Sequence, residues 1–129
     1  GTKFIITMAP LGTSLQYDES GMGGFIYKQL FNTYEGQFIN WFNCQCYNSY
    51  TVEDVDKMVD NGYPNNKIVM GMISSQFPTN RSFYKKLDVI EQIKDKYPNI
   101  GGVDIWEYSD SPPGHNINPV LWSKFMYYL

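Results

Sequence analysis

Polar and aromatic residues alternate in two short segments of the chain. Asn43, Gln45 and Tyr47 lie two residues apart, and so do Asp104 and Trp106. Side chains of a β-strand point to alternate faces, so each set is expected to share one face of its strand. Together they offer hydrogen-bond donors and acceptors beside a flat apolar ring, the kind of surface on which a sugar stacks. For most of the aromatic residues, however, burial in the core is the favoured interpretation.

The other reactive residues show no partners in the sequence. His115 is the only histidine, and the sequence offers it no partner for a catalytic triad or a metal site. Cys44 and Cys46 would share one face of a strand, too far apart and too parallel to bridge each other easily. We interpret both as small buried hydrophobic residues. The sequence therefore predicts neither a metal site nor a cofactor.

Four apolar runs recur at intervals of about thirty residues, the size of a strand–helix unit. Each is rich in β-branched or aromatic residues and is bounded by turn residues, which is typical of strands. The predicted strands are residues 3–9, 38–47, 67–73 and 102–108.

Helical patterns separate these runs. Residues 51–54, Thr-Val-Glu-Asp, predict a capping box, because a hydroxyl and a carboxylate can satisfy the free N–H groups of a first turn. The apolar residues that follow repeat at helical spacing up to a glycine stop at Gly62. Further helices are predicted around residues 25–30, over 83–97 and from 118 to 125.

Alternating strands and helices predict a parallel α/β sheet with right-handed crossovers. Four strands leave two open edges and one uncovered face. A flavodoxin-like domain would cover both faces with helices, whereas a barrel would need four more strands. Periodicity leaves both arrangements open.

Composition narrows the functional classes. The net charge is −3 with acids and bases interspersed, so a nucleic-acid partner is not expected. No apolar run approaches the roughly 20 residues of a membrane span. The chain begins at Gly1 and not at Met, so we expect either a processed N-terminus or a longer parent chain. The sequon at residues 80–82, Asn-Arg-Ser, would fit a secreted or extracellular protein.

The strand ends resemble a known family. Residues 5–10, Ile-Ile-Thr-Met-Ala-Pro, resemble the fifth strand of family 18 glycoside hydrolases, the chitinase family. Residues 43–48, Asn-Cys-Gln-Cys-Tyr-Asn, resemble the Gln-x-Tyr-Asn signature of the sixth strand. Residues 65–71 resemble the seventh, and residues 101–106, Gly-Gly-Val-Asp-Ile-Trp, the eighth, which ends in a floor tryptophan. The matches occur in family order and cover nearly the whole chain.

This resemblance implies the fold. Residues 1–129 would form a single partial domain, the C-terminal half (strands five to eight) of a (β/α)8 TIM barrel, with its site at the C-terminal strand ends. The missing N-terminal half-barrel would come from the same or another chain.

The resemblance also implies site roles. In the family the substrate's own 2-acetamido oxygen attacks the anomeric carbon while a single acid protonates the leaving oxygen. Tyr47 is then the catalytic candidate, because it would hydrogen-bond the acetamido group. Trp106 would form the apolar floor, and Gln45 and Asn48 would bind the sugar. Met8 would pack beneath the sugar, although burial in the core is the favoured interpretation for Met8. For Gln45 the alternative is a polar network in the core.

Two departures from the family pattern matter. Its acid lies in an Asp-x-x-Asp-x-Asp-x-Glu motif of the fourth strand, which this chain lacks. Glu107 has Ile105, and not a carboxylate, two residues before it, so we expect it not to be the acid. Asp104 replaces an apolar residue and is predicted to face inward as part of the substrate site. That costs free energy unless it bonds Tyr47, a backbone amide or a group of the missing half; the alternative is that it meets solvent.

The leading hypothesis is therefore an enzyme. The complete protein would hydrolyse β-1,4 linkages beside N-acetylglucosamine, in chitin or in N-glycan cores, whereas this chain alone lacks the acid. One alternative is a catalytically silent, chitinase-like carbohydrate-binding protein. Another is a structural half-barrel component of an assembly.

Overall fold

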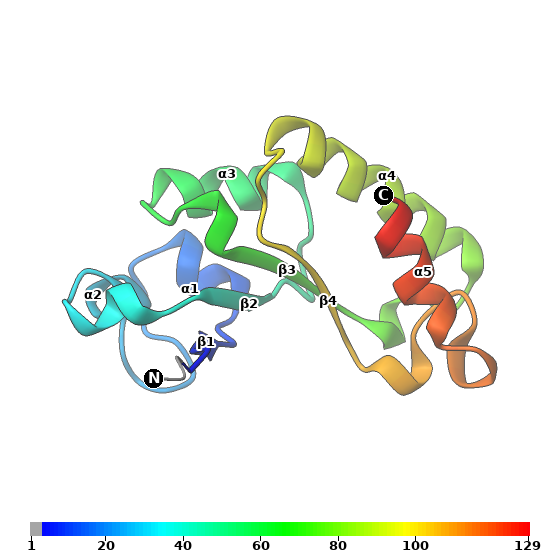
Figure 1. Cartoon of the computed structure of the whole chain (residues 1–129), viewed down its shortest axis with the longest axis horizontal. Helices are drawn as coiled ribbons and strands as arrows, with labels where there is room; N and C mark the ends of the chain where they lie inside the picture. Colours follow the sequence, from blue (N-terminus) through cyan, green and yellow to red (C-terminus); the bar gives the residue numbers. More distant parts are fainter. Residues whose placement is uncertain (1–3) are drawn as a thin grey trace.

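A computed structural model describes residues 4–129, and its centre is a four-stranded parallel sheet (Figure 1). The strands follow the chain in the order β1 (Thr7–Met8), β2 (Trp41–Gln45), β3 (Ile68–Ile73) and β4 (Gly102–Trp106). Every neighbouring pair is parallel, as predicted. Each strand is shorter than its apolar run, and β1 has only two residues. Both β1 and β4 lie at an edge of the sheet and have one neighbouring strand. Lys3, the first residue of the first predicted strand, lies outside the described residues.

Over residues 4–129, five α-helices connect and flank the strands. They are α1 (Gly12–Gln16), α2 (Tyr27–Phe31), α3 (Val52–Asp60), α4 (Asn80–Lys96) and α5 (Val120–Tyr128). The four predicted helices correspond to α2 through α5. Helix α1 was not predicted, because five residues are too few to show a helical period.

Helix α3 begins as its sequence predicts. The backbone N–H of Asp54 donates to Thr51 Oγ1 at 3.2 Å, and the backbone N–H of Thr51 donates to Asp54 Oδ2 at 2.8 Å. This reciprocal pair is a capping box, and it satisfies two N–H groups that the helix itself leaves free. Gly62, at φ +98°, follows the end of the helix in a conformation that favours glycine.

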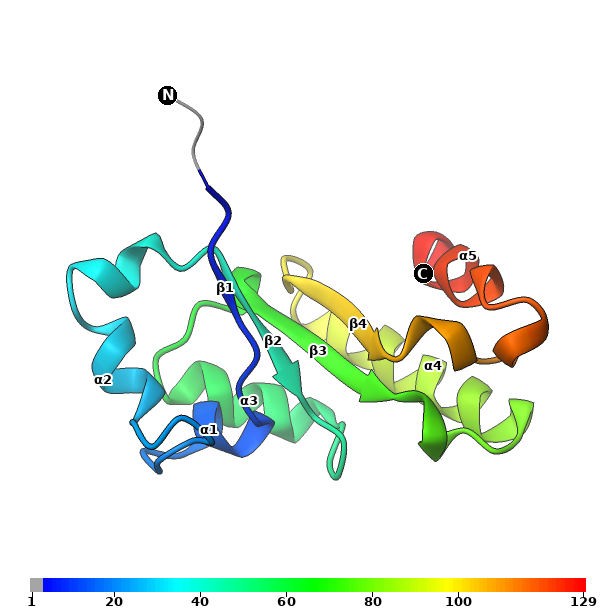
Figure 2. The same cartoon turned by 90° about the horizontal axis from the view of Figure 1, so that it is seen from below.

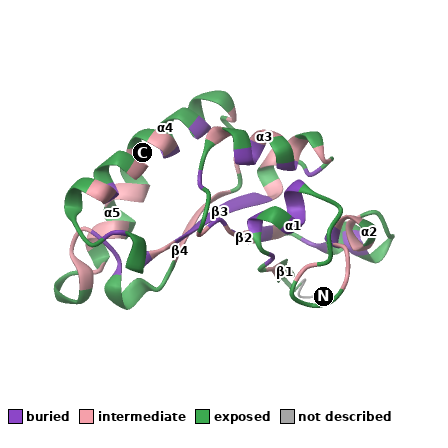
Figure 3. Ribbon diagram, turned by 180° about the vertical axis from the view of Figure 1, so that it is seen from behind, coloured by how far each residue is buried: buried purple, intermediate pink, exposed green. Residues whose placement is uncertain are grey.

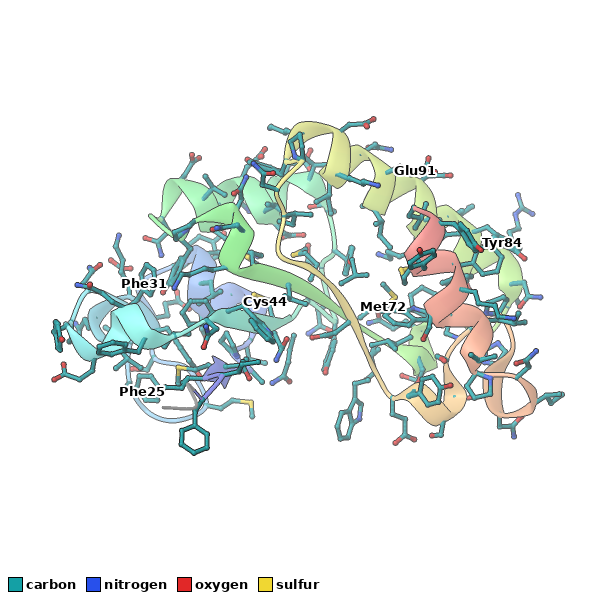
Figure 4. All side chains as sticks on the ribbon, viewed as in Figure 1. Phe25, Phe31, Cys44, Met72, Tyr84 and Glu91 are labelled. Carbon is teal, nitrogen blue, oxygen red and sulfur yellow. The ribbon has the colours of Figure 1, made fainter. Side chains whose placement is uncertain are left out.

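Helices α1, α3 and α4 cover one face of the sheet and leave the other open (Figure 2). The core lies between the sheet and these helices, where buried residues concentrate (Figure 3). It contains Phe42 and Met70 together with Cys44 and Met72, which Figure 4 labels. Cys44 and Cys46 are both buried and unbridged, which confirms their interpretation as hydrophobic residues. The one-sided cover excludes a flavodoxin-like domain, which needs helices on both faces.

Helix α5 packs against α4 at the far end of the sheet. The rings of Phe83 and Phe125 meet edge to face, with centroids 5.7 Å apart. Helix α4 has 17 residues and is the longest helix that the structure describes. Within residues 4–129, no helix combines the length and the apolar character needed to cross a membrane.

Candidate functional site

The open face of the sheet carries its polar residues in rows. Gly71 of β3 lies in register with Gln45 of β2 and with Asp104 of β4. One step further along the strands, Ile73 lies in register with Trp106. Residues in register across parallel strands share a face, so the alternation in the sequence becomes stacked layers of side chains.

A cleft of about 640 Å³ opens above these layers. Four of the residues selected from the sequence line it, namely Gln45, Tyr47, Asp104 and Trp106. Asn43, which shares their face, lines it as well, together with Ala9, Ile73 and Ile105. The cleft therefore joins hydrogen-bonding groups to an apolar wall at the C-terminal ends of the strands.

Trp106 presents an accessible aromatic ring to the cleft. It is 64% exposed, although it is the last residue of a strand. An indole ring with that much free surface can receive a flat ligand by stacking.

Internal hydrogen bonds fix the amides of β2. Gln45 Nε2 donates to the carbonyl oxygen of Ala9 at 2.7 Å and so ties the end of β1 to β2. Asn43 Oδ1 accepts from Trp41 Nε1 at 3.0 Å. Part of the hydrogen-bonding capacity of both amides is thus used within the protein, although the bond of Gln45 is exposed and does not belong to a polar network in the core.

Asp104 sits deeper in the cleft and is half-buried. Burial raises the pKa of its carboxyl to about 6, because a charged carboxylate loses hydration there. A Cβ placed on Gly71 would come within 2.5 Å of Asp104 Oδ1, so the carboxyl occupies space that only glycine leaves free. Asp104 lines the cleft on the open face of the sheet.

Tyr47 follows β2, and a hydrogen bond to its backbone carbonyl holds it in place. The side-chain amide of Gln76, from the segment after β3, donates to the carbonyl oxygen of Tyr47. Burial, and then the negative charge of Asp104, raise the pKa of the Tyr47 phenol. Its hydroxyl therefore keeps its proton at neutral pH and can donate a hydrogen bond.

Two selected residues lie elsewhere. Met8 is half-buried and packs against the hydrophobic core, where the sequence also favoured placing it. Asn48 lines a separate groove of about 100 Å³ between the segments that follow β1 and β2. Gln45 contributes to both the cleft and this groove.

The other candidate groups stay outside the cleft. Glu107 is exposed and is not among the lining residues, which agrees with its exclusion as the acid. His115 Nδ1 lies 3.4 Å from Asp110 in the segment after β4. Within residues 4–129, no group of three potential metal ligands comes together.

Three contributors were missed from the sequence. Ile73 lines the cleft two residues after Gly71, so the period of two along the third run was a signal for it. Gly71 makes room for Asp104, and Gln76 holds Tyr47. The last two depend on contacts between strands or loops, for which a single sequence contains no signal.

Comparison with solved structures identifies the fold. The structure of a fungal endo-β-N-acetylglucosaminidase from glycosyl hydrolase family 18 matches with a TM-score of 0.81 at 32% identity, over 98% of this chain and 46% of that chain. The structure of the chitinase ChiC from Aspergillus fumigatus matches with a TM-score of 0.72 at 30% identity, over 99% of this chain and 48% of that chain. No family model and no curated protein matches the chain.

The chain spans about half the length of these two structures. The predicted fold class, an α/β half of a (β/α)8 TIM barrel, is therefore confirmed. The resemblance of the strand ends agrees with the likeness of the folds: over nearly its whole length the chain resembles about half of a glycosyl hydrolase family 18 structure.

Proposed function

We propose that residues 1–129 form one partial domain, the C-terminal half (strands five to eight) of the catalytic barrel of a glycosidase. The complete protein hydrolyses β-1,4 linkages beside N-acetylglucosamine, in chitin or in related glycans. The observation that carries this proposal is the cleft that Gln45, Tyr47, Asp104 and Trp106 line together. The two similar structures, a chitinase and an endo-β-N-acetylglucosaminidase, support this class of substrate.

The proposed reaction is assisted by the substrate. The acetamido oxygen forms a bond to the anomeric carbon while the bond to the leaving oxygen breaks and an acid protonates that oxygen. The resulting oxazolinium-like intermediate is opened by water, so the configuration is retained. No cofactor is needed, because the substrate supplies the nucleophile.

Tyr47 and Trp106 have separate tasks in this reaction. The Tyr47 hydroxyl donates a hydrogen bond to the acetamido oxygen, and its neutral state suits a donor. The exposed ring of Trp106 supports the sugar at the cleavage site. Gln45 offers its side-chain oxygen, since its nitrogen is bonded to Ala9.

The acid belongs to the other half of the barrel, supplied by the same chain or by another. The Asp-x-x-Asp-x-Asp-x-Glu motif does not occur in this sequence. Glu107 is exposed and does not line the cleft. We also propose a secreted or extracellular location, which the exposed Asn80 of the sequon supports.

A cleft without an acid motif also fits a second function. If the other half has lost the acid, the complete protein is a chitinase-like carbohydrate-binding protein. The residues at the fourth strand of the other half decide between the two, because the enzyme requires the terminal Glu of the motif. Gln, Leu or Asn at that position favours the binding protein.

The test is an assay of the full-length protein on a fluorogenic N-acetylglucosamine oligomer. We expect turnover, with the β-anomer of the product appearing first in a proton NMR time course. Release of the α-anomer first would contradict substrate-assisted hydrolysis. Binding of the oligomer without turnover would favour the carbohydrate-binding protein.

A further inference from the structure

Asp104 is the one cleft carboxyl among the described residues, and it has no partner there. No hydrogen bond or ion pair within residues 4–129 involves its carboxylate, and burial is the sole cause of its shifted pKa. An inward carboxylate without a partner is costly, so proteins usually pair it with a cation or with hydrogen-bond donors. Its place in an open cleft makes a ligand a possible donor.

Among the described residues, the neighbours of Asp104 supply no partner for its carboxylate. In its own row, Gly71 has no side chain and Gln45 has its nitrogen bonded to Ala9. From β2, the charge of Asp104 acts on Tyr47 and, through the sheet, on Cys44 and Cys46, none of which is a cation. No lysine or arginine is among the residues that line the cleft.

The layers define what reaches this carboxyl. Asp104 precedes Trp106 by two residues on one strand, so it lies roughly 7 Å deeper along that strand. Gly71, in register with Asp104 on β3, has no side chain to cover the carboxyl. A group that projects below a sugar ring seated on Trp106 therefore meets Asp104 Oδ1 first.

We propose that Asp104 is a specificity-determining residue that accepts a hydrogen bond from a donor group of the sugar, a hydroxyl or an ammonium, at the bottom of the cleft. The inference rests on the proposed function and deepens it. With Asp104 at the bottom of the cleft, the sugar ring bound at Trp106 needs a hydrogen-bond donor that points toward it. An apolar residue at position 104 would not select for such a donor. Both oligomers offer hydroxyl donors, whereas only a deacetylated ring offers an ammonium. A deacetylated ring on Trp106 would bind without being hydrolysed, because it lacks the acetamido group that supplies the nucleophile.

The test uses the full-length protein and two ligands, a fully N-acetylated oligomer and a partly deacetylated one of equal length. Three variants are compared, namely Asp104→Leu, Asp104→Asn and, as a matched control outside the cleft, Glu107→Gln. KM is measured for both ligands, Kd by calorimetry if turnover is absent, and thermal unfolding reports folding. A lost hydrogen bond to a charged group costs about tenfold or more in affinity.

We expect Asp104→Leu to raise KM or Kd about tenfold for at least one ligand, with Glu107→Gln unchanged. If Asp104→Asn keeps the affinity for the acetylated oligomer, the donor is a hydroxyl. If Asp104→Asn selectively loses the deacetylated oligomer, the donor is an ammonium. Unchanged affinity of a folded Asp104→Leu for both ligands would overturn the inference alone, and it would place the partner of Asp104 in the other half-barrel. A wild-type protein that binds neither ligand would overturn the proposed function as well.

Discussion

Gly71 and Asp104 lie in register on neighbouring strands, and Asp104 Oδ1 fills the space beside the missing side chain of Gly71. A Cβ on residue 71 would come within 2.5 Å of that oxygen and within 2.6 Å of the carbonyl oxygen of Cys44. The glycine therefore serves two purposes: it lets the sheet close at this point, and it admits a carboxyl to the cleft.

We expect Gly71→Ala to destabilise the full-length protein by about 2 kcal/mol, because a methyl group is forced into filled space. Urea unfolding measures the loss. The double variant Gly71→Ala/Asp104→Ala removes the contact with the carboxyl and leaves the one with the Cys44 carbonyl. It should regain part of the stability, whereas an equal loss in both variants would show that Asp104 does not occupy this space.

The pKa of Asp104 gives a prediction about pH. Burial raises the pKa to about 6, above the ordinary value near 3.9, so the folded state binds the proton more tightly than the unfolded state. The contribution of Asp104 to stability is then largest below pH ~4 and is lost as the pH rises to about 6. In Asp104→Asn this loss should be absent, and the variant should exceed the wild type in stability above pH 6.

Urea unfolding at a series of pH values and NMR titration of the carboxyl carbon measure this effect. The neighbours Tyr47, Cys44 and Cys46 do not interfere, because burial raises the pKa of each above this range. A carboxyl that titrates near pH 4 would contradict the burial of Asp104.

Tyr47 is expected to act on the chemical step. In the full-length enzyme, Tyr47→Phe removes a donor to the oxygen on which charge changes, and kcat should fall roughly 10²-fold with a smaller change in KM. Tyr127→Phe is the matched control, because Tyr127 is 82% exposed on α5. Equal kcat values for Tyr47→Phe and the wild type would remove Tyr47 from the mechanism.

Gln76 is expected to act through Tyr47. Its amide holds the Tyr47 carbonyl, so Gln76→Ala should loosen the segment and lower kcat by less than Tyr47→Phe does. In the background of Tyr47→Phe the same change should have little further effect. Gln37→Ala, at an exposed glutamine that does not line the cleft, serves as the control. Additive losses in the double variant would indicate that Gln76 acts independently.

Much of the fold followed from local patterns. The four apolar runs became four parallel strands in order, and the capping box at Thr51 formed as predicted. The period of two placed Gln45, Tyr47, Asp104 and Trp106 on one face, and the structure brings them into one cleft. These features depend on patterns within a few neighbouring residues, and a single sequence contains those patterns.

The remainder depends on contacts between distant segments. Nothing in the sequence indicated that Gln45 Nε2 would donate a hydrogen bond to the carbonyl oxygen of Ala9, 36 residues away. Asn48 follows Tyr47 directly, yet it lines another groove, because the chain turns away after β2. Periodicity predicts the face on which a residue lies, but not the partner that it meets there.

The central claim is that this chain supplies the half of the site that holds the sugar and that the acid comes from the other half. Its most direct test is hydrolysis of a fluorogenic N-acetylglucosamine oligomer, measured in parallel on residues 1–129 and on the full-length protein. We predict turnover by the full-length protein and none above background by residues 1–129, since a positioned acid contributes about 10²–10⁴-fold and the motif that carries the acid does not occur in residues 1–129. Robust turnover by residues 1–129 that disappears in Glu107→Gln would contradict the claim and make Glu107 the acid.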